Sequence, residues 1–155
     1  MSTDGRSARV RTAEVCRAVV RSFAVTARLL ATRRLAMPRT LVGARLPAGD
    51  GTSPVVFRET AVRDAVAADP VVLVVWFRLR WIGRARWAHA VFRRTCLVNT
   101  PLFAGFSGFR TKLWLADPDT DVYRGLYEWD GAAAAEAYGT RLSAVLALVA
   151  VPGSI

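Results

Sequence analysis

The chain has 155 residues, of which 53% are hydrophobic and 22% are charged. This length suits one domain with a sizeable core, and the hydrophobic content excludes an intrinsically disordered protein. The 22 basic residues outnumber the 12 acidic ones, which gives a net charge of +10. All but one of the basic residues are arginine, a bias typical of a GC-rich genome, so the charge is weak evidence for nucleic acid as a partner.

Several classes of protein are excluded by what the sequence lacks. No apolar run reaches the roughly 18 residues of a membrane span, and the first residues do not resemble a secretory signal, so we expect a cytoplasmic protein. Its two cysteines, Cys16 and Cys96, are too few for a disulfide framework or a zinc cluster, and Cys96 is expected to be a core thiol. No pattern indicates a flavin, a nicotinamide, a haem or a metal, so no cofactor is expected.

The first 35 residues are strongly basic, with eight arginines against two acidic residues. Their periodicity predicts an amphipathic helix from Thr12 to Leu35 that is stopped by Pro38. An apolar stripe of Val15, Val19, Phe23 and Leu30 lies opposite a basic stripe of Arg17, Arg21 and Arg28. We expect the apolar stripe to pack on the domain or on a partner subunit, and the alternative is peripheral contact of residues 12–35 with an anionic membrane.

Residues 36–69 are electrically balanced and predict a β-hairpin. Thr40 to Leu46 and Val55 to Thr60 are expected to be extended, with the Gly- and Asp-containing residues 47–51 as the loop. The chain therefore divides into an N-terminal extension of basic helix plus hairpin, residues 1–69, and a main domain, residues 70–155.

The main domain predicts the element order β-α-β-β-α, which is an α+β, ferredoxin-like arrangement one strand short of its full set. A fourth strand is expected to begin at Val151. The predicted elements are a strand at Val71–Leu79, a helix at Arg84–Leu97, strands at Phe109–Ala116 and Val122–Trp129 around a turn at Asp117–Thr120, and a helix at Gly131–Val149.

Alternation along the strands separates an aromatic and cationic face from an aliphatic one. A register that pairs Leu115 with Val122 places six residues on one face: Arg110, Lys112, Trp114, Tyr123, Tyr127 and Trp129. In the first strand, Val72, Val74, Trp76 and Arg78 share a face. We expect the aliphatic faces to pack against the two helices, and the aromatic and cationic faces to line a barrel or pocket.

Such a face is suited to a planar ligand that is anionic or phenolic. Aromatic rings supply stacking area, and cations or tyrosine hydroxyls stabilise or relay charge and protons. The predicted catalytic residues are Lys112, Tyr127 and Tyr123, and the predicted ligand-binding residues are Trp76, Arg78, Arg110, Trp114 and Trp129. The alternative is that these aromatic side chains fill a dimer core. His89, the only histidine, is expected to be a solvated surface residue, so no metal cluster or Ser-His-Asp triad is predicted.

Short motifs in residues 71–155 resemble the YdhR-type branch of the dimeric α+β barrel proteins, which are related to the antibiotic-biosynthesis monooxygenases. The motifs are Gly108-Phe109, Lys112-Leu113-Trp114, Gly125-Leu126-Tyr127-Glu128-Trp129-Asp130 and Ala135-Glu136-Ala137-Tyr138. The resemblance implies a homodimer that binds a small aromatic or anionic molecule. It also implies a cofactor-independent monooxygenase-like or cyclase-like activity on an aromatic or polyketide-like substrate. A non-catalytic ligand-binding or protein-interaction module is the alternative.

Overall fold

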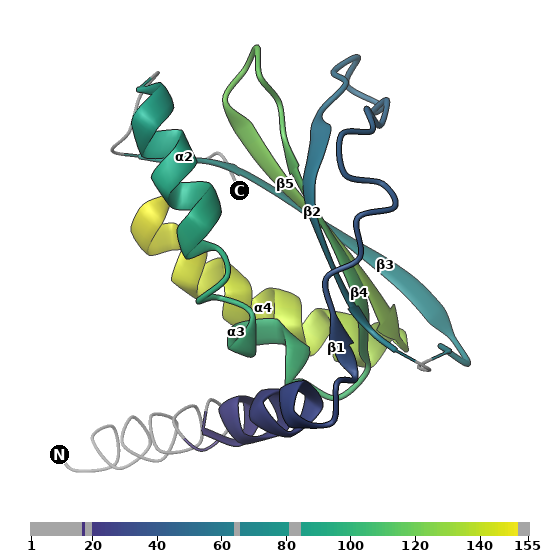
Figure 1. Cartoon of the computed structure of the whole chain (residues 1–155). Coiled ribbons are helices and arrows are strands. Elements are labelled where there is room, and N and C mark those ends of the chain that lie inside the picture. Colours follow the sequence, from purple (N-terminus) through teal and green to yellow (C-terminus); the bar gives the residue numbers. More distant parts are fainter. Residues whose placement is uncertain (1–16, 18–19, 64–65, 81–84, 152–155) are drawn as a thin grey trace, which may run out of the picture.

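The computed structural model describes residues 17, 20–63, 66–80 and 85–151. Five antiparallel strands form one sheet in the order β1-β2-β4-β5-β3. Their bounds are β1 Leu35–Ala36, β2 Val55–Val62, β3 Pro70–Arg78, β4 Phe109–Ala116 and β5 Val122–Asp130. The helices lie on one side of this sheet, so the architecture is α+β and ferredoxin-like, as the sequence predicts (Figure 1).

Three helices are described in the main domain: α2 at Arg86–Thr95, α3 at Pro101–Ala104 and α4 at Ala132–Val149. The predicted helices before β4 and after β5 are confirmed to within two residues at each end. The single turn α3 was not predicted, because four residues are too few for a helical hydrophobic period to show. It begins at Pro101, whose fixed φ and missing N–H suit the first turn of a helix.

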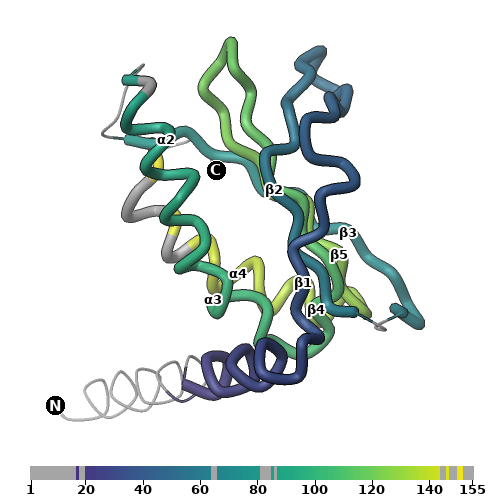
Figure 2. Tube along the Cα trace, in the orientation of Figure 1, coloured from purple at the N-terminus to yellow at the C-terminus, as the bar shows by residue number. Residues whose placement is uncertain are grey.

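The N-terminal helix is described over residues 20–31 and ends earlier than predicted. Arg33 has a left-handed backbone with φ 55°, and the Arg34 amide donates to the Leu29 carbonyl, which closes the helix before Pro38 is reached. The released chain then forms β1 beside β2. Figure 2 follows this path from the purple helix into the edge of the sheet.

The face that this helix buries differs from the predicted one. Phe23 and Leu30 are 48% and 54% exposed, whereas Ser22 and Thr26 are each 2% exposed; Val15 and Val19 lie outside the described residues. The Ser22 hydroxyl donates to the Pro101 carbonyl at 2.5 Å, so the contact with α3 is made by small polar side chains at close range. Phe23 and Leu30 of the apolar stripe therefore do not pack on the domain itself, because the short backbone-to-backbone distance has no room for large side chains. Packing of this stripe on a partner subunit stays a prediction.

Gly105 makes this close approach possible, and Gly105→Ala is expected to separate the N-terminal helix from α3. A Cβ atom at position 105 would lie 2.0 Å from the Ser22 carbonyl oxygen. The clash should lower the free energy of unfolding by about 1–3 kcal/mol and speed proteolysis within residues 20–31. Urea denaturation and limited proteolysis measure the two effects. Gly49→Ala, where a Cβ meets nothing within 4 Å, is the matched control, and equal behaviour of the two variants would contradict the packing.

The predicted hairpin is present only in part: residues 40–46 form no strand and contribute one isolated bridge between Arg45 and Val55, whereas residues 55–62 form β2. Hydrogen bonds join residues 43–46 to residues 54–56, and β2 then pairs along its length with β4. The buried Glu59 carboxylate accepts the amide protons of Leu41 and Val42, which holds the returning segment against the sheet. The strand from the N-terminal extension therefore belongs to the same sheet as the main domain.

The sheet faces show where the predicted arrangement was wrong. Tyr127 pairs with Leu73 and with Lys112, so these three residues share a face, and that face packs against the helices. Trp76 and Arg78 point to the opposite side, and Trp76 is 53% exposed. The aromatic face is thus the helix-covered face. In β3 the residues that share it are Val71, Leu73, Val75 and Phe77, which pair with Trp129, Tyr127, Gly125 and Tyr123.

The β4–β5 register and a bulge in β4 also differ from the predicted hairpin. Leu115 pairs with Arg124, not with Val122, since the turn after β4 is two residues longer on the β5 side than predicted. A bulge between Phe109 and Thr111 places Phe109 in the core and leaves Arg110 beside Asp130, with 2.5 Å between Nη2 and Oδ2. Because side chains alternate between faces with a period of two, a register shift of two residues leaves the remaining side chains of the hairpin on their predicted faces.

The chain after α4 turns toward the open edge of β3. Ala150 forms an isolated antiparallel bridge with Leu79, and the Val151 amide donates to the Arg78 carbonyl. This is where the fourth strand was expected to begin, and residues 152–155 lie outside the described part of the chain. No helix among the described residues is long and apolar enough to cross a membrane.

Candidate functional site

A cavity of about 420 Å³ lies between the helix-covered face of the sheet and the helices. This volume falls in the range of small-molecule sites. Its lining is mainly aromatic and aliphatic, with one lysine, two tyrosines and a polar rim of Arg80, Thr95 and Asn99. The remaining lining residues are Phe77, Leu79, Phe92, Leu102, Phe103, Lys112, Trp114, Tyr127, Tyr138, Leu142 and Leu146.

Lys112 projects from β4 into an aromatic cage and is 4% exposed. Its Nζ lies 2.9 Å from the centroid of the Trp114 ring, 4.4 Å from that of Phe103 and 4.4 Å from that of Tyr127. The Trp114 ring is itself fixed by a hydrogen bond of 3.2 Å from its Nε1 to the Thr60 hydroxyl. Among the described residues, no carboxylate forms an ion pair with the amine.

Burial sets the protonation of this interior. Removal from water lowers the pKa of Lys112 well below its usual 10.5, and the nearby Arg58 guanidinium lowers it further. Burial likewise raises the pKa of the Cys96 thiol. Arg58 is anchored by a 2.8 Å hydrogen bond from Nη2 to the Arg93 carbonyl. Burial therefore disfavours the charged forms of both the Lys112 amine and the Cys96 thiol, beside the Arg58 guanidinium.

Two tyrosine hydroxyls form a second polar group in the same cavity. The rings of Tyr138 of α4 and Tyr127 of β5 lie against each other, with centroids 5.2 Å apart. Burial raises the pKa of both hydroxyls, so both remain protonated donors at neutral pH. The cavity thus offers a buried amine and two phenolic proton donors within a largely apolar wall.

His89 is not the surface residue that the sequence predicted. Its side chain is 12% exposed, its Nδ1 lies 2.7 Å from the Tyr123 hydroxyl, and its Nε2 lies 3.6 Å from Asp121 Oδ1. The two rings stack with centroids 5.7 Å apart. Burial raises the pKa of Tyr123 to about 12, so its hydroxyl keeps its proton at neutral pH, and the tautomer of His89 sets which of the two groups donates. These residues line an open cleft of about 930 Å³ together with Arg93.

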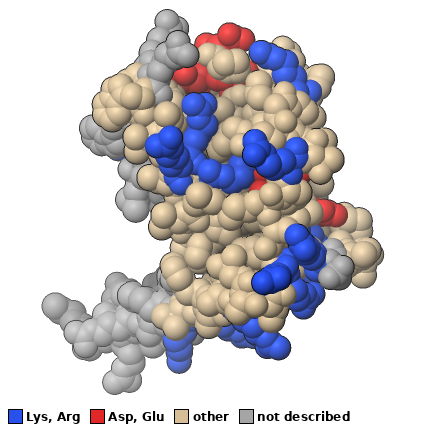
Figure 3. Space-filling view, in the orientation of Figure 1, with Lys and Arg blue, Asp and Glu red and all other residues tan. Residues whose placement is uncertain are grey.

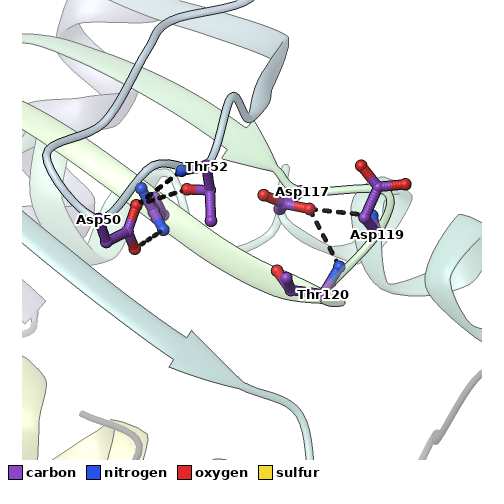
Figure 4. Close-up of polar contacts among 6 residues, drawn as sticks. Asp50, Thr52, Asp117, Asp119 and Thr120 are labelled. Carbon is purple, nitrogen blue, oxygen red and sulfur yellow. Dashed lines mark hydrogen bonds and ion pairs between the residues drawn. The ribbon is translucent and has the colours of Figure 1, made fainter.

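The β4–β5 turn places Asp121 in this group. The Asp117 carboxylate accepts the amide protons of Asp119 and Thr120 at 2.9 and 3.0 Å, and Figure 4 shows it directed back across the turn. Asp121 follows with a left-handed φ of 57°, a conformation that Asp tolerates better than most residues. Asp50 similarly orders its own turn through Thr52 and pairs with Arg124 at 2.6 Å.

A double-mutant cycle tests the His89–Tyr123 hydrogen bond. Tyr123→Phe and His89→Phe each keep the ring but leave the other partner's polar atom unpaired, so each should lower the free energy of unfolding by about 1–3 kcal/mol. The double variant should lose about 0.5–2 kcal/mol less than the sum of the singles, because no orphaned partner remains. Urea denaturation measures all four proteins. Strictly additive losses would show that the pair does not interact.

The structure separates the residues that the sequence grouped together. Lys112, Tyr127 and Trp114 line the 420 Å³ cavity, and Tyr123 lines the adjacent cleft. Tyr123 and Lys112 also border a small cavity of about 20 Å³. Four predicted ligand-binding residues do not line the main cavity: Trp76 and Arg78 lie on the outer face, Arg110 pairs with Asp130, and Trp129 is 0% exposed in the core.

Several cavity residues were not selected from the sequence. Tyr138, Leu142 and Leu146 recur at the four-residue spacing of one helix face, so the period of α4 could have identified them. Phe103 on α3 carries no such signal. His89 was set aside because Arg86 and Arg93 lie three and four residues away, a spacing that indicated a basic helix face.

Metal-binding clusters and surface charge offer no better-formed site among the described residues. No group of three or more His, Cys, Asp or Glu side chains in that part of the chain is placed to hold a metal ion. On the face shown in Figure 3, basic side chains form separate groups with uncharged surface between them. The aromatic cavity is therefore the better-formed site for a small molecule.

No family model matches the chain, and no curated protein matches it. Among solved structures, a crystal structure from Listeria monocytogenes is similar. It is described as an uncharacterized ferredoxin-fold protein related to antibiotic biosynthesis monooxygenases. The TM-score is 0.43 with 14% sequence identity, and the match covers 64% of this chain and 54% of that one. The chain thus spans about half the length of that structure.

Proposed function

We propose that the protein binds an aromatic or polyketide-like small molecule in the 420 Å³ cavity and acts on it as a cofactor-independent cyclase-like or monooxygenase-like enzyme. The observation that carries this proposal is a buried lysine on the wall of a largely apolar cavity, with no carboxylate partner among the described residues. Burial lowers its pKa, which favours the neutral amine. A neutral amine in such a place is a base, which an exposed ammonium is not.

The first step common to both activities is removal of an acidic C–H or O–H proton by Lys112. The ammonium that forms lies against the Trp114 ring face, where cation–π attraction stabilises it. The developing enolate or phenolate is stabilised by this cation and by hydrogen bonds from the Tyr127–Tyr138 pair. The enolate then closes a ring on a second carbonyl in a cyclase, or reacts with dioxygen in a monooxygenase.

Proton transfer to Lys112 is tested with naphthol, an aromatic alcohol whose hydroxyl is protonated at neutral pH and whose phenolate absorbs at longer wavelength. We expect wild-type protein to bind naphthol and to raise the phenolate absorbance. Lys112→Met should abolish the spectral shift and weaken binding at least tenfold, about 1.4 kcal/mol. Calorimetry gives the affinity and absorbance gives the ionisation.

Arg141→Met is the matched control, because Arg141 is an exposed cation on α4 that does not line the cavity. It should retain both the affinity and the shift. If naphthol binds wild type and Lys112→Met equally and without ionisation, Lys112 is not a base and the protein is better described as a ligand-binding module. If no aromatic ligand binds, the cavity is not a site at all.

The active form in this proposal is a homodimer joined through the outer face of the sheet. Val72, Val74 and Trp76 are 58%, 44% and 53% exposed there, an apolar surface that a monomer would leave in water. Sedimentation at micromolar concentration should show a dimer that Trp76→Glu dissociates. A soluble wild-type monomer under these conditions would contradict the homodimer.

A further inference from the structure

We propose that Lys112 is a nucleophile that captures an apolar aldehyde or ketone in the cavity as a Schiff base. This rests on the proposed function, since it requires the same cavity to hold the ligand, and it assigns the substrate class as a carbonyl compound with an aromatic or aliphatic body. Covalent capture is a different role from proton removal, and the two make different products.

The geometry favours attack by this amine. Phe103, Trp114 and Tyr127 surround Nζ, while the same side chain lines the cavity. The cage therefore holds the amine at the wall of the cavity. Among the described residues, no carboxylate forms an ion pair with this amine. Burial keeps the lone pair free, since it disfavours the charged amine.

The reaction balances with the groups that line the cavity. The amine lone pair forms a bond to the carbonyl carbon, and one amine hydrogen passes to the carbonyl oxygen to give a carbinolamine. The C–O bond then breaks, and the hydroxyl leaves with the second amine hydrogen as one water molecule. Tyr127 or Tyr138 donates a hydrogen bond to the departing oxygen. Nothing is oxidised or reduced, and the apolar wall made by Leu102, Leu142 and Leu146 keeps bulk water from the imine.

The sequence makes the capture easy to locate. Lys112 is the only lysine among 155 residues, and arginine does not form stable imines under these conditions. The N-terminal amine is the other primary amine of the chain. A reduced adduct can therefore form at either of these two amines, and Lys112 is a residue that lines the cavity.

The test treats the full chain with naphthaldehyde and sodium cyanoborohydride at neutral pH. The reductant delivers hydride to the imine carbon and the nitrogen takes a proton, which fixes the adduct as a secondary amine. We expect one adduct by intact mass, located on Lys112 by peptide mapping, and formed at least tenfold faster than on the N-terminus. Lys112→Met and Lys112→Arg should retain only the slow N-terminal reaction, and excess naphthalene should slow the reaction at Lys112.

Three results would overturn the inference. Adduct on the N-terminus alone, while naphthalene binds with measurable affinity, leaves the ligand site in place but removes covalent capture. Adduct on Lys112 at the same rate in urea-unfolded protein shows ordinary amine chemistry rather than capture by the cavity. Failure of both naphthalene and naphthaldehyde to bind removes the inference together with the proposed function, so the two failures are distinguishable.

Discussion

The free energy of unfolding is expected to rise with pH through the neutral range, by about 1.4 kcal/mol for each pH unit, and Lys112→Met is expected to remove this rise. In the unfolded chain the lysine holds its proton up to pH 10.5, whereas in the folded protein burial lowers its pKa well below that value. Between those two pKa values the unfolded state binds one proton more, so raising the pH favours folding. Lys112→Met should also be more stable at neutral pH, because its thioether needs no deprotonation to occupy the aromatic cage.

The measurement is urea denaturation of wild type and Lys112→Met at intervals between about pH 6.5 and 8.5, with Arg141→Met as the control. The upper limit matters because the pKa of buried Cys96 is raised above its ordinary 9.0. Above that pH the unfolded thiol loses a proton that the folded one keeps, which opposes the rise in stability due to Lys112. Parallel curves for wild type and Lys112→Met would mean that the lysine is charged in the folded protein.

Trp129→Ala is expected to lower the free energy of unfolding by about 3–5 kcal/mol, the largest loss among single truncations in this core. Trp129 is 0% exposed and packs between Phe109 and Tyr138, with ring centroids 5.6 and 4.8 Å away. Removal of the indole would leave a cavity that the rigid sheet cannot close. Thermal or urea denaturation measures the loss.

Trp87→Ala provides the comparison, because Trp87 is 74% exposed on α2 and its truncation should change stability by no more than about 0.5 kcal/mol. The result also bears on the sequence-based prediction that Trp129 binds ligand. A small loss of unfolding free energy in Trp129→Ala together with weaker naphthol binding would show that Trp129 contributes to ligand binding. A large loss assigns it to the core.

The strands of the main domain could be predicted because their signals are local. Phe109–Ala116 and Val122–Asp130 alternate in character around a turn rich in Asp, and β3 is a run of β-branched and aromatic residues. Which face of β3 meets the helices is not a local property, since both of its faces are apolar, and that assignment was wrong. The pairing of β2 with β4 likewise could not be predicted from local sequence patterns.

Part of the site was predictable for a similar reason. Lys112 stands out as the single lysine in an arginine-rich chain, and Tyr127 shares its strand face, so both were selected and both line the cavity. The contribution of Phe103 depends on a one-turn helix with no periodic signal. The partnership of His89 with Tyr123 joins residues 34 positions apart and needs the packed structure.

The strand order also sets the sequence of folding events. β4 and β5 are the one pair of main-domain strands joined by a short turn, so their hairpin can close quickly. In contrast, Val55 pairs with Ala116 and Pro70 pairs with Asp130, so these pairs can form only after a long stretch of chain has been closed into a loop. During synthesis β2 and β3 therefore leave the ribosome well before the strands that complete their hydrogen bonds. The apolar edge of β3 is the segment most exposed to aggregation in that interval, which is where a chaperone would be needed.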